Sequence, residues 1–197
     1  MIPNAALEAL RAQAPLVHCI TNYVAMNIAA NVTLAAGASP AMIHAPEEVA
    51  DFAPIAGALT INIGTLSTQW VDSMKAAAVA ANSANVPWVL DPVAHFATAY
   101  RAKVAKDLLT LQPTILRGNA SEIIALAGGA GSGKGADSGD SVNDAQSAAE
   151  VWACRFYHRR RAQRQRHRRF RPYAEGDSFG MLFNSAAGSL CRCSTEP

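Results

Sequence analysis

The chain has 197 residues, of which 50% are hydrophobic and 16% are charged, and its formal net charge is +2. This composition excludes a chain that is disordered throughout, because enough apolar side chains are present to form a sizeable core. The charge is unevenly divided, since residues 1–150 contain 7 Lys/Arg and 12 Asp/Glu whereas residues 151–197 contain 10 Lys/Arg and only 3 Asp/Glu.

Up to about residue 150, short apolar segments alternate with Ala-rich segments of helical periodicity, the pattern of a sheet whose strands are connected by helices. In chain order, the sequence predicts helix 3–13, strand 16–20, helix 22–36, strand 41–43, helix 47–56, strand 58–63, helix 69–83, strand 88–90, helix 99–111, strand 114–116 and helix 121–127. The strands are apolar at nearly every position, as in a parallel sheet with helices on both faces. The predicted fold class is α/β.

Polar residues and glycines follow each predicted strand. They are Thr21-Asn22, His44-Ala45-Pro46, Gly64-Thr65, Asp91-Pro92-Val93 and Arg117-Gly118-Asn119. Because ligands of such sheets bind at the carboxyl ends of the strands, we expect the binding site at this edge.

Two carboxylates belong to this edge. Asp91 directly follows a strand, where it could face the site or cap a turn or helix, and the pattern favours neither interpretation. Glu122 begins a helix, where a carboxylate also interacts with the helix dipole. Together they could hold magnesium, which prefers oxygen ligands. Arg117, at a strand end beside Gly118, indicates an anion site.

The remaining polar residues of the patterned part are harder to interpret. His18 and Cys19 lie inside a strand and are expected to be buried structural residues. His44 and His95 stay ambiguous. Residues 128–135, GGAGSGKG, resemble a phosphate-binding loop, but Gly135 replaces the Ser or Thr that binds magnesium and no strand precedes the segment. We favour a flexible glycine loop.

The pattern is lost from about residue 151. Nine arginines occur in residues 152–172, no further strand-helix-strand unit is predicted, and neither period 2 nor period 3.6 persists to the end. An arginine-rich segment can bind nucleic acid through phosphates, but the helical face or aromatic platform of a known module is missing. Out-of-frame translation of GC-rich DNA explains the segment better. Cys154, Cys191 and Cys193 form neither a disulfide framework nor a recognisable zinc site.

Several long motifs resemble the hydroxyethylthiazole kinase family of thiamine salvage. They are PLVHCITNYVAMNIAANVTLAAGASPAMIHAPEEVADFA, INIGTLS, VPWVLDPVA, LRGNASEIIALAG and GKGADS, within about residues 10–150. The resemblance implies a ribokinase-like α/β fold, and the loss of pattern predicts that the sheet is truncated after about residue 150. It also implies transfer of the ATP γ-phosphate to the hydroxyl of 4-methyl-5-(2-hydroxyethyl)thiazole with Mg²⁺, and a homotrimer with thiazole pockets at subunit interfaces.

Site residues follow from the same resemblance. Met42, Asn22 and Gly64-Thr65 are expected to line the thiazole pocket. Arg117 and Asn119 are expected to bind ATP, while Asp91 and Glu122 are expected to organise magnesium and the transferring group. These roles agree with phosphoryl transfer, which depends on positioning and charge neutralisation.

Two family motifs do not occur after residue 150: a Val-Thr-Gly motif that contacts ATP, and a Gly-Thr-Gly-Cys turn that forms the anion hole. Cys191 and Cys193 lack the glycine turn, so no catalytic residue is assigned. We hypothesise that the reading frame shifts near Glu150, leaving residues 151–197 as a non-family, disordered tail. Translating the other two frames beyond codon 150 tests this hypothesis. One of them should contain the two missing motifs, and their absence from both frames would contradict the frameshift.

The sequence therefore predicts a small-molecule kinase with little or no activity in this chain. A nucleic-acid-binding protein and a thiazole-binding remnant without catalysis remain alternatives. No apolar run is long enough to span a membrane, and the first residues do not have the layout of a secretory signal, so we expect a cytoplasmic protein.

Overall fold

The structure, a computed structural model, describes residues 4–129, 146–149, 169–175 and 178–184. It consists of two units, Met1–Pro113 and Thr114–Pro197. The boundary expected near residue 150 falls inside the second unit.

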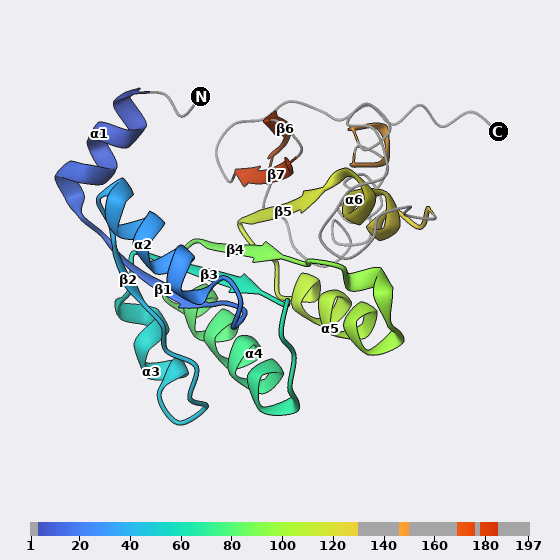
Figure 1. The fold of residues 1–197 in the computed structure, drawn as a ribbon, viewed down its shortest axis with the longest axis horizontal. Helices are drawn as coiled ribbons and strands as arrows, with labels where there is room; N and C mark the ends of the chain where they lie inside the picture. Colours follow the sequence, from blue (N-terminus) through green and yellow to red (C-terminus); the bar gives the residue numbers. More distant parts are fainter. Residues whose placement is uncertain (1–3, 130–145, 150–168, 176–177, 185–197) are drawn as a thin grey trace. The chain divides into compact units, whose positions relative to one another are not determined.

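In the first unit, four parallel strands are ordered β2-β1-β3-β4 (Figure 1). The strands are β1 Leu16–Ile20, β2 Ser39–Ala41, β3 Ala58–Asn62 and β4 Trp88–Asp91. The helices are α1 Asn4–Gln13, α2 Met26–Ala36, α3 Val49–Phe52, α4 Thr68–Ser83 and α5 Ala99–Thr110, with 3-10 turns η1 Ala53–Ile55 and η2 His95–Ala97. The predicted alternation of strands and helices, and the parallel direction of these four strands, are confirmed.

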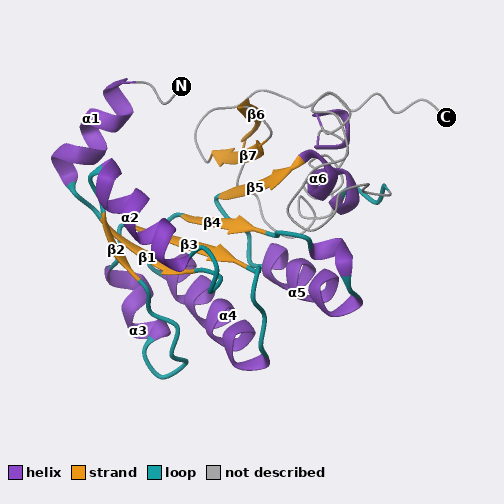
Figure 2. Ribbon diagram, viewed as in Figure 1, coloured by secondary structure: helices purple, strands orange, loops and turns teal. Residues whose placement is uncertain are grey.

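Helices α4 and α5 lie side by side along the strands (Figure 2). Lys75 on α4 donates a hydrogen bond to Asp107 on α5 over 2.8 Å. Beneath them the core is built from strand and helix side chains that are almost completely buried, among them Ile20, Leu59, Ile61, Met74, Trp88 and Leu90. Burial of this apolar surface is the main stabilising contribution to the unit and fixes the strand ends.

Strand β2 differs from the prediction. The sequence predicts a strand at 41–43, whereas the structure has it at Ser39–Ala41. Pro40 is tolerated because β2 lies at the edge of this unit's sheet, where a proline without an N–H removes no bond to a neighbouring strand. The shift places Met42 directly after the strand, at its carboxyl end.

Two helix predictions also needed correction. The segment 47–56 forms α3 and then η1, because Pro54 cannot continue the hydrogen-bond ladder of an α-helix. The helix predicted at 22–36 begins only at Met26. None of the residues of α2 is buried, although most of them are apolar. This helix therefore presents an exposed apolar surface.

The second unit contains β5 Ile115–Asn119, α6 Ala120–Leu126, β6 Arg169–Glu175 and β7 Ser178–Asn184. Strand β5 pairs antiparallel with β7, and β7 pairs antiparallel with β6. The sequence predicted no further strand-helix-strand unit after residue 151, and the two described strands there, β6 and β7, are paired antiparallel. Within the described residues, no helix is long and apolar enough to cross a membrane.

Candidate active site at the carboxyl ends of the strands

Asn22, after β1, and Asn62, at the end of β3, are joined by a hydrogen bond. The Asn22 Nδ2 donates to the Asn62 Oδ1 over 2.9 Å, and the same oxygen accepts from the Gly64 N–H over 2.8 Å. The Asn22 Oδ1 in turn accepts from the Ala25 N–H at 2.9 Å. The two side chains thus fix the loops after β1 and β3 against each other.

Asn62 was missed by the sequence analysis. The available signal was a single amide residue at the end of an otherwise apolar strand, Ala58–Asn62. Its importance depends on a partner 40 residues away in the chain, Asn22. In the parallel register Asn62 also lies opposite Asp91 of β4, so this amide lies between the loop residues after β1 and the carboxylate at the end of β4.

Gly64 is required by the close approach of Asn22. A Cβ atom on Gly64 would lie only 2.7 Å from the Asn22 Cβ and 2.8 Å from its Nδ2. The neighbouring Thr65 Oγ1 accepts a hydrogen bond from the Tyr23 N–H over 3.3 Å. The predicted residues Asn22, Gly64 and Thr65 are therefore brought together.

His44 connects Met42 to the same loops. Its Nδ1 donates to the Met42 carbonyl over 3.1 Å, and its Nε2 accepts from the Thr21 N–H over 3.3 Å. These partners require the neutral tautomer with the proton on Nδ1. Burial lowers the pKa of His44, an effect larger than the opposing backbone hydrogen bonds. Met42 is thereby linked through His44 to the residue that precedes Asn22.

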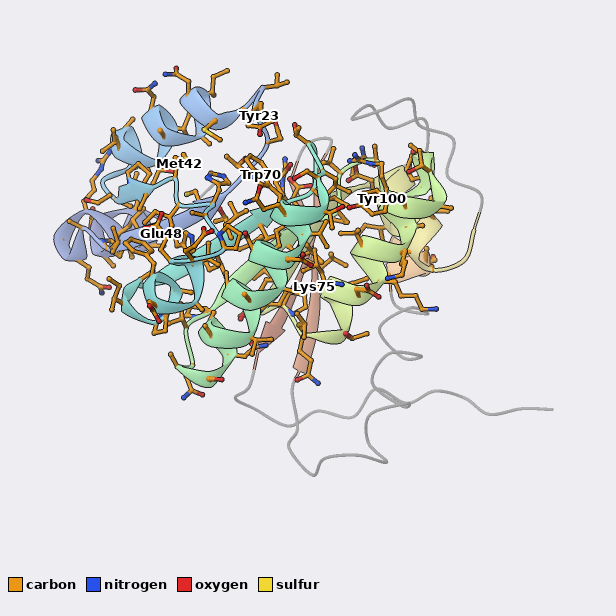
Figure 3. The ribbon with its side chains drawn as sticks, turned by 90° about the horizontal axis from the view of Figure 1, so that it is seen from below. Tyr23, Met42, Glu48, Trp70, Lys75 and Tyr100 are labelled. Carbon is orange, nitrogen blue, oxygen red and sulfur yellow. The ribbon has the colours of Figure 1, made fainter. Side chains whose placement is uncertain are left out.

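An aromatic group borders this network. The His44 ring stacks on Trp70 with centroids 4.4 Å apart, and Tyr23 lies against Trp70 at 4.7 Å. Figure 3 labels Tyr23, Trp70 and Met42, which come from the loop after β1, from α4 and from the loop after β2, respectively. The ambiguous His44 is thus a support of the site, held by its stack and its two hydrogen bonds.

His18 and Cys19 are buried, as expected. The His18 Nε2 donates to the Ile43 carbonyl over 2.9 Å, so it supports the loop that contains Met42. Burial lowers the pKa of His18 and raises the pKa of the Cys19 thiol. Both effects favour the neutral side chains, which suits structural residues beneath the loops.

Asp91 is the last residue of β4, and its carbonyl accepts from the Ile63 N–H over 3.2 Å. Asp91 caps neither of the two helices that follow it, because Ala94 precedes η2 and Thr98 caps α5, whereas the interpretation as a turn residue stays a prediction. Asp91 therefore remains at the predicted edge. Its role towards magnesium is a prediction.

In the second unit, Asn119 and Glu122 form a capping box at the start of α6. The Asn119 Oδ1 accepts from the Glu122 N–H at 2.9 Å, and the Glu122 Oε2 accepts from the Asn119 N–H at 2.8 Å. The structural interpretation of Glu122 is thus confirmed. Arg117 lies within β5 and is exposed, not at the strand end as predicted, because the strand continues to Asn119.

The donor chemistry is compatible with magnesium, which takes one or two carboxylates together with waters and phosphate oxygens. Asp91 has a carboxylate at the end of β4, and Glu122 has one in the first turn of α6. Among the described residues, no three His, Cys, Asp or Glu side chains are grouped to hold a metal ion by themselves.

Other predicted features lie outside the described residues. These are residues 130–135 of the glycine segment, the arginines between positions 155 and 168, and Cys154, Cys191 and Cys193.

Comparison with known proteins shows which family this chain resembles. Residues 7–158 match the hydroxyethylthiazole kinase family, so the match continues past the point near residue 150 where the motifs were expected to end. Hydroxyethylthiazole kinase of Roseobacter denitrificans is 69% identical over 156 residues, which cover 79% of this chain and 61% of that protein. The enzyme of Rhizobium etli strain CIAT 652 is 70% identical over 143 residues, covering 73% and 55%.

A solved structure of hydroxyethylthiazole kinase protein from Pyrococcus horikoshii OT3 is also similar. It has a TM-score of 0.67 and 39% sequence identity, and the match covers 77% of this chain and 56% of that one. The expected ribokinase-like α/β fold is therefore confirmed. The chain spans between 55% and 61% of the length of these two curated relatives.

Proposed function

The chain belongs to the hydroxyethylthiazole kinase family, and from this membership we propose that its first unit binds 4-methyl-5-(2-hydroxyethyl)thiazole. The observation that carries the proposal is the network at the carboxyl ends of β1, β2 and β3, which joins Asn22, Gly64 and Thr65 and reaches Met42 through His44. Ligands of open α/β sheets bind at this edge. A half-buried methionine whose backbone is linked through His44 to the loop of the fixed amides suits an apolar heterocycle that carries one hydroxyl.

The reaction we propose for this family site is transfer of the γ-phosphate of ATP to that hydroxyl. Such transfer depends on holding acceptor and phosphate in line and on neutralising charge. In our proposal Arg117 and Asn119 contact ATP, while Asp91 and Glu122 hold Mg²⁺, which shields the phosphate charge when bound. The same proposal places the chain in the cytoplasm, where ATP is available.

We further propose that phosphoryl transfer by this chain is weak. The Val-Thr-Gly and Gly-Thr-Gly-Cys motifs expected on the ATP side occur nowhere in the 197 residues. Loss of oxyanion-type donors alone costs about 10²- to 10³-fold in rate. We propose a frameshift near codon 150 as the explanation for the non-family sequence, and the family match itself ends at residue 158.

The purified chain is expected to bind the thiazole alcohol without ATP and to phosphorylate it at least about 10²-fold more slowly than a full-length family member. Calorimetry measures the binding, and coupled ADP release measures the turnover.

Met42→Ala should weaken binding of the thiazole alcohol about tenfold, because a large apolar contact is removed. Ile55→Ala is the control, since Ile55 is 67% exposed and lies on η1. Turnover equal to that of the full-length enzyme would contradict the proposed loss of activity, and equal binding by both variants would remove Met42 from the site.

We also propose that the chain assembles as a homotrimer through α2. The support is the exposed apolar surface of this helix, on which Ile28 is 65% and Val32 61% exposed. These two residues are four positions apart and thus share one face of the helix. Val24, just before the helix, is 89% exposed. Monomeric proteins rarely leave a contiguous apolar surface of this kind uncovered.

Sedimentation should therefore give a trimer for the unmodified chain and a monomer for Ile28→Lys, because a charge cannot be buried in an apolar interface without a partner. Val79→Lys is the matched control, since Val79 is 51% exposed on α4 and should leave the trimer intact. A monomeric unmodified chain would rule out this assembly.

A further inference from the structure

Arg101 lies in the first turn of α5, a position that is unfavourable for a cation in a helix dipole. Helix stability therefore does not explain its presence. Its half-buried side chain turns back towards the strands instead and donates four hydrogen bonds to backbone carbonyl oxygens. The position of the four acceptor oxygens indicates the role of this side chain.

The four carbonyl oxygens belong to two loops. After β3, Nη2 donates to Ile63 over 2.8 Å and Nη1 to Gly64 over 3.2 Å. After β4, Nη2 donates to Val93 over 2.6 Å and Nε to Ala94 over 3.0 Å. A guanidinium is suited to this task because its donors are held in one plane, whereas a lysine ammonium is a point charge.

Both loops contain residues of the proposed site. Gly64 precedes Thr65 in the proposed thiazole pocket, and Val93 follows Asp91, the proposed magnesium ligand, by two residues. The side chain of Arg101 thus joins the loop of the proposed thiazole pocket to the loop that follows the proposed magnesium ligand.

The loop after β4 is also strained. Ala94 has φ +50°, in the left-handed region that non-glycine residues seldom adopt. Such a conformation costs free energy and persists only where surrounding contacts impose it. The hydrogen bond from Arg101 to the Ala94 carbonyl is one such contact.

We propose that Arg101 is a positioning residue that fixes the Gly64-Thr65 loop relative to the loop that follows Asp91, and so sets the distance between the bound thiazole alcohol and the phosphate-binding edge. The inference rests on the proposed thiazole site. In this proposal Arg101 contacts neither substrate and acts only through the four backbone carbonyl groups to which it donates hydrogen bonds.

The test compares Arg101→Ala, Arg101→Lys and Lys106→Ala in the full chain. Lys106→Ala is the matched control, because it removes an exposed cation from the same helix. Amide hydrogen exchange of residues 62–66 and 91–95 and thiazole affinity by calorimetry are measured, each with and without millimolar methylguanidinium. Circular dichroism establishes that each variant is folded.

Arg101→Ala is expected to exchange at least about tenfold faster in both loops and to bind thiazole about tenfold more weakly, because several charge-assisted hydrogen bonds are lost. Methylguanidinium should restore both properties in Arg101→Ala and change nothing in Lys106→Ala. Arg101→Lys should show smaller increases in loop exchange and a smaller loss of thiazole affinity. If Arg101→Ala does not fold, the proposal is tested by Arg101→Lys instead.

Unchanged exchange and affinity in Arg101→Ala, or in Arg101→Lys if that is the folded variant, would overturn the inference. So would faster exchange spread evenly over the unit without rescue, because that is the result of a general loss of stability. If the unmodified chain does not bind thiazole while the two loops still loosen selectively and are rescued, the proposed function fails and the role of Arg101 as a clamp of these loops stands.

Discussion

Replacing Gly64 with alanine is expected to displace Asn22 and so to disrupt the hydrogen-bond network of the proposed thiazole pocket. The new Cβ would lie 2.7 Å from the Asn22 Cβ, a backbone-proximal atom that cannot swing away as a side-chain end can. Asn22 must shift, which breaks its hydrogen bonds to Asn62 and Ala25. We expect a loss of about 1–3 kcal/mol in the free energy of unfolding from overpacking. Thiazole binding should weaken at least about tenfold, which corresponds to 1.4 kcal/mol.

Gly57→Ala is the matched control for this experiment. Gly57 precedes β3, at the opposite end of the strand, and its Cβ would lie 3.1 Å from the Pro15 Cβ. Some stability should be lost there too, but thiazole affinity should stay unchanged. Urea unfolding separates the stability effects from the calorimetric affinities. Equal affinities for both variants would show that Gly64 is not part of the pocket.

Acidification from pH 7 to pH 4 is expected to lower the free energy of unfolding by about 3 kcal/mol through His95 alone. His95 is 4% exposed, and burial lowers its pKa from 6.5 to about 4, with the charge of Arg101 acting in the same direction and a hydrogen bond to Pro92 opposing it. The unfolded chain therefore binds the proton more readily than the folded one. This stabilisation is fully present above pH 6.5 and is lost as the pH falls towards 4.

His95→Gln should remove most of this pH dependence, because glutamine does not titrate. A smaller decline should remain from His18 and His44, whose pKa values are also lowered by burial. Hydrogen bonds from Lys75 and Lys103 lower the pKa of Asp107 below 3.8, so this carboxylate acts only at still lower pH. Urea unfolding at pH 7, 5.5 and 4 makes the comparison. A decline of equal size in both proteins would contradict the assignment to His95.

Local patterns in the sequence were sufficient where a structural element depends on its own residues. The strand Leu16–Ile20 was predicted with its observed bounds, because five successive residues favour a buried strand over a helix. The edge of the sheet that holds Asn22, Gly64 and Asp91 could also be predicted, since polar residues there follow apolar strands. The resemblance of long motifs then identified the family.

Structural features that depend on residues far apart in the chain could not be predicted from local sequence patterns. The position of β2 was wrong by two residues because Pro40 is acceptable only in a strand that has a free edge, and strand order is a tertiary property. Asn62 and His44 were missed or left ambiguous for the same reason. Their partners, Asn22 and Thr21, are 40 and 23 residues away.

The sequence by itself determined the α/β class, the family and the edge of the sheet at which we propose the site, because hydrophobic periodicity and contiguous motifs are local properties of the chain. Only the tertiary structure decided that Arg101 binds the carbonyls after β3 and β4, that Gly64 must lack a side chain, and that β5 pairs antiparallel with β7. Hydrogen-bond geometry and close packing between segments far apart in the chain arise only when the strands are aligned, and no local pattern encodes them.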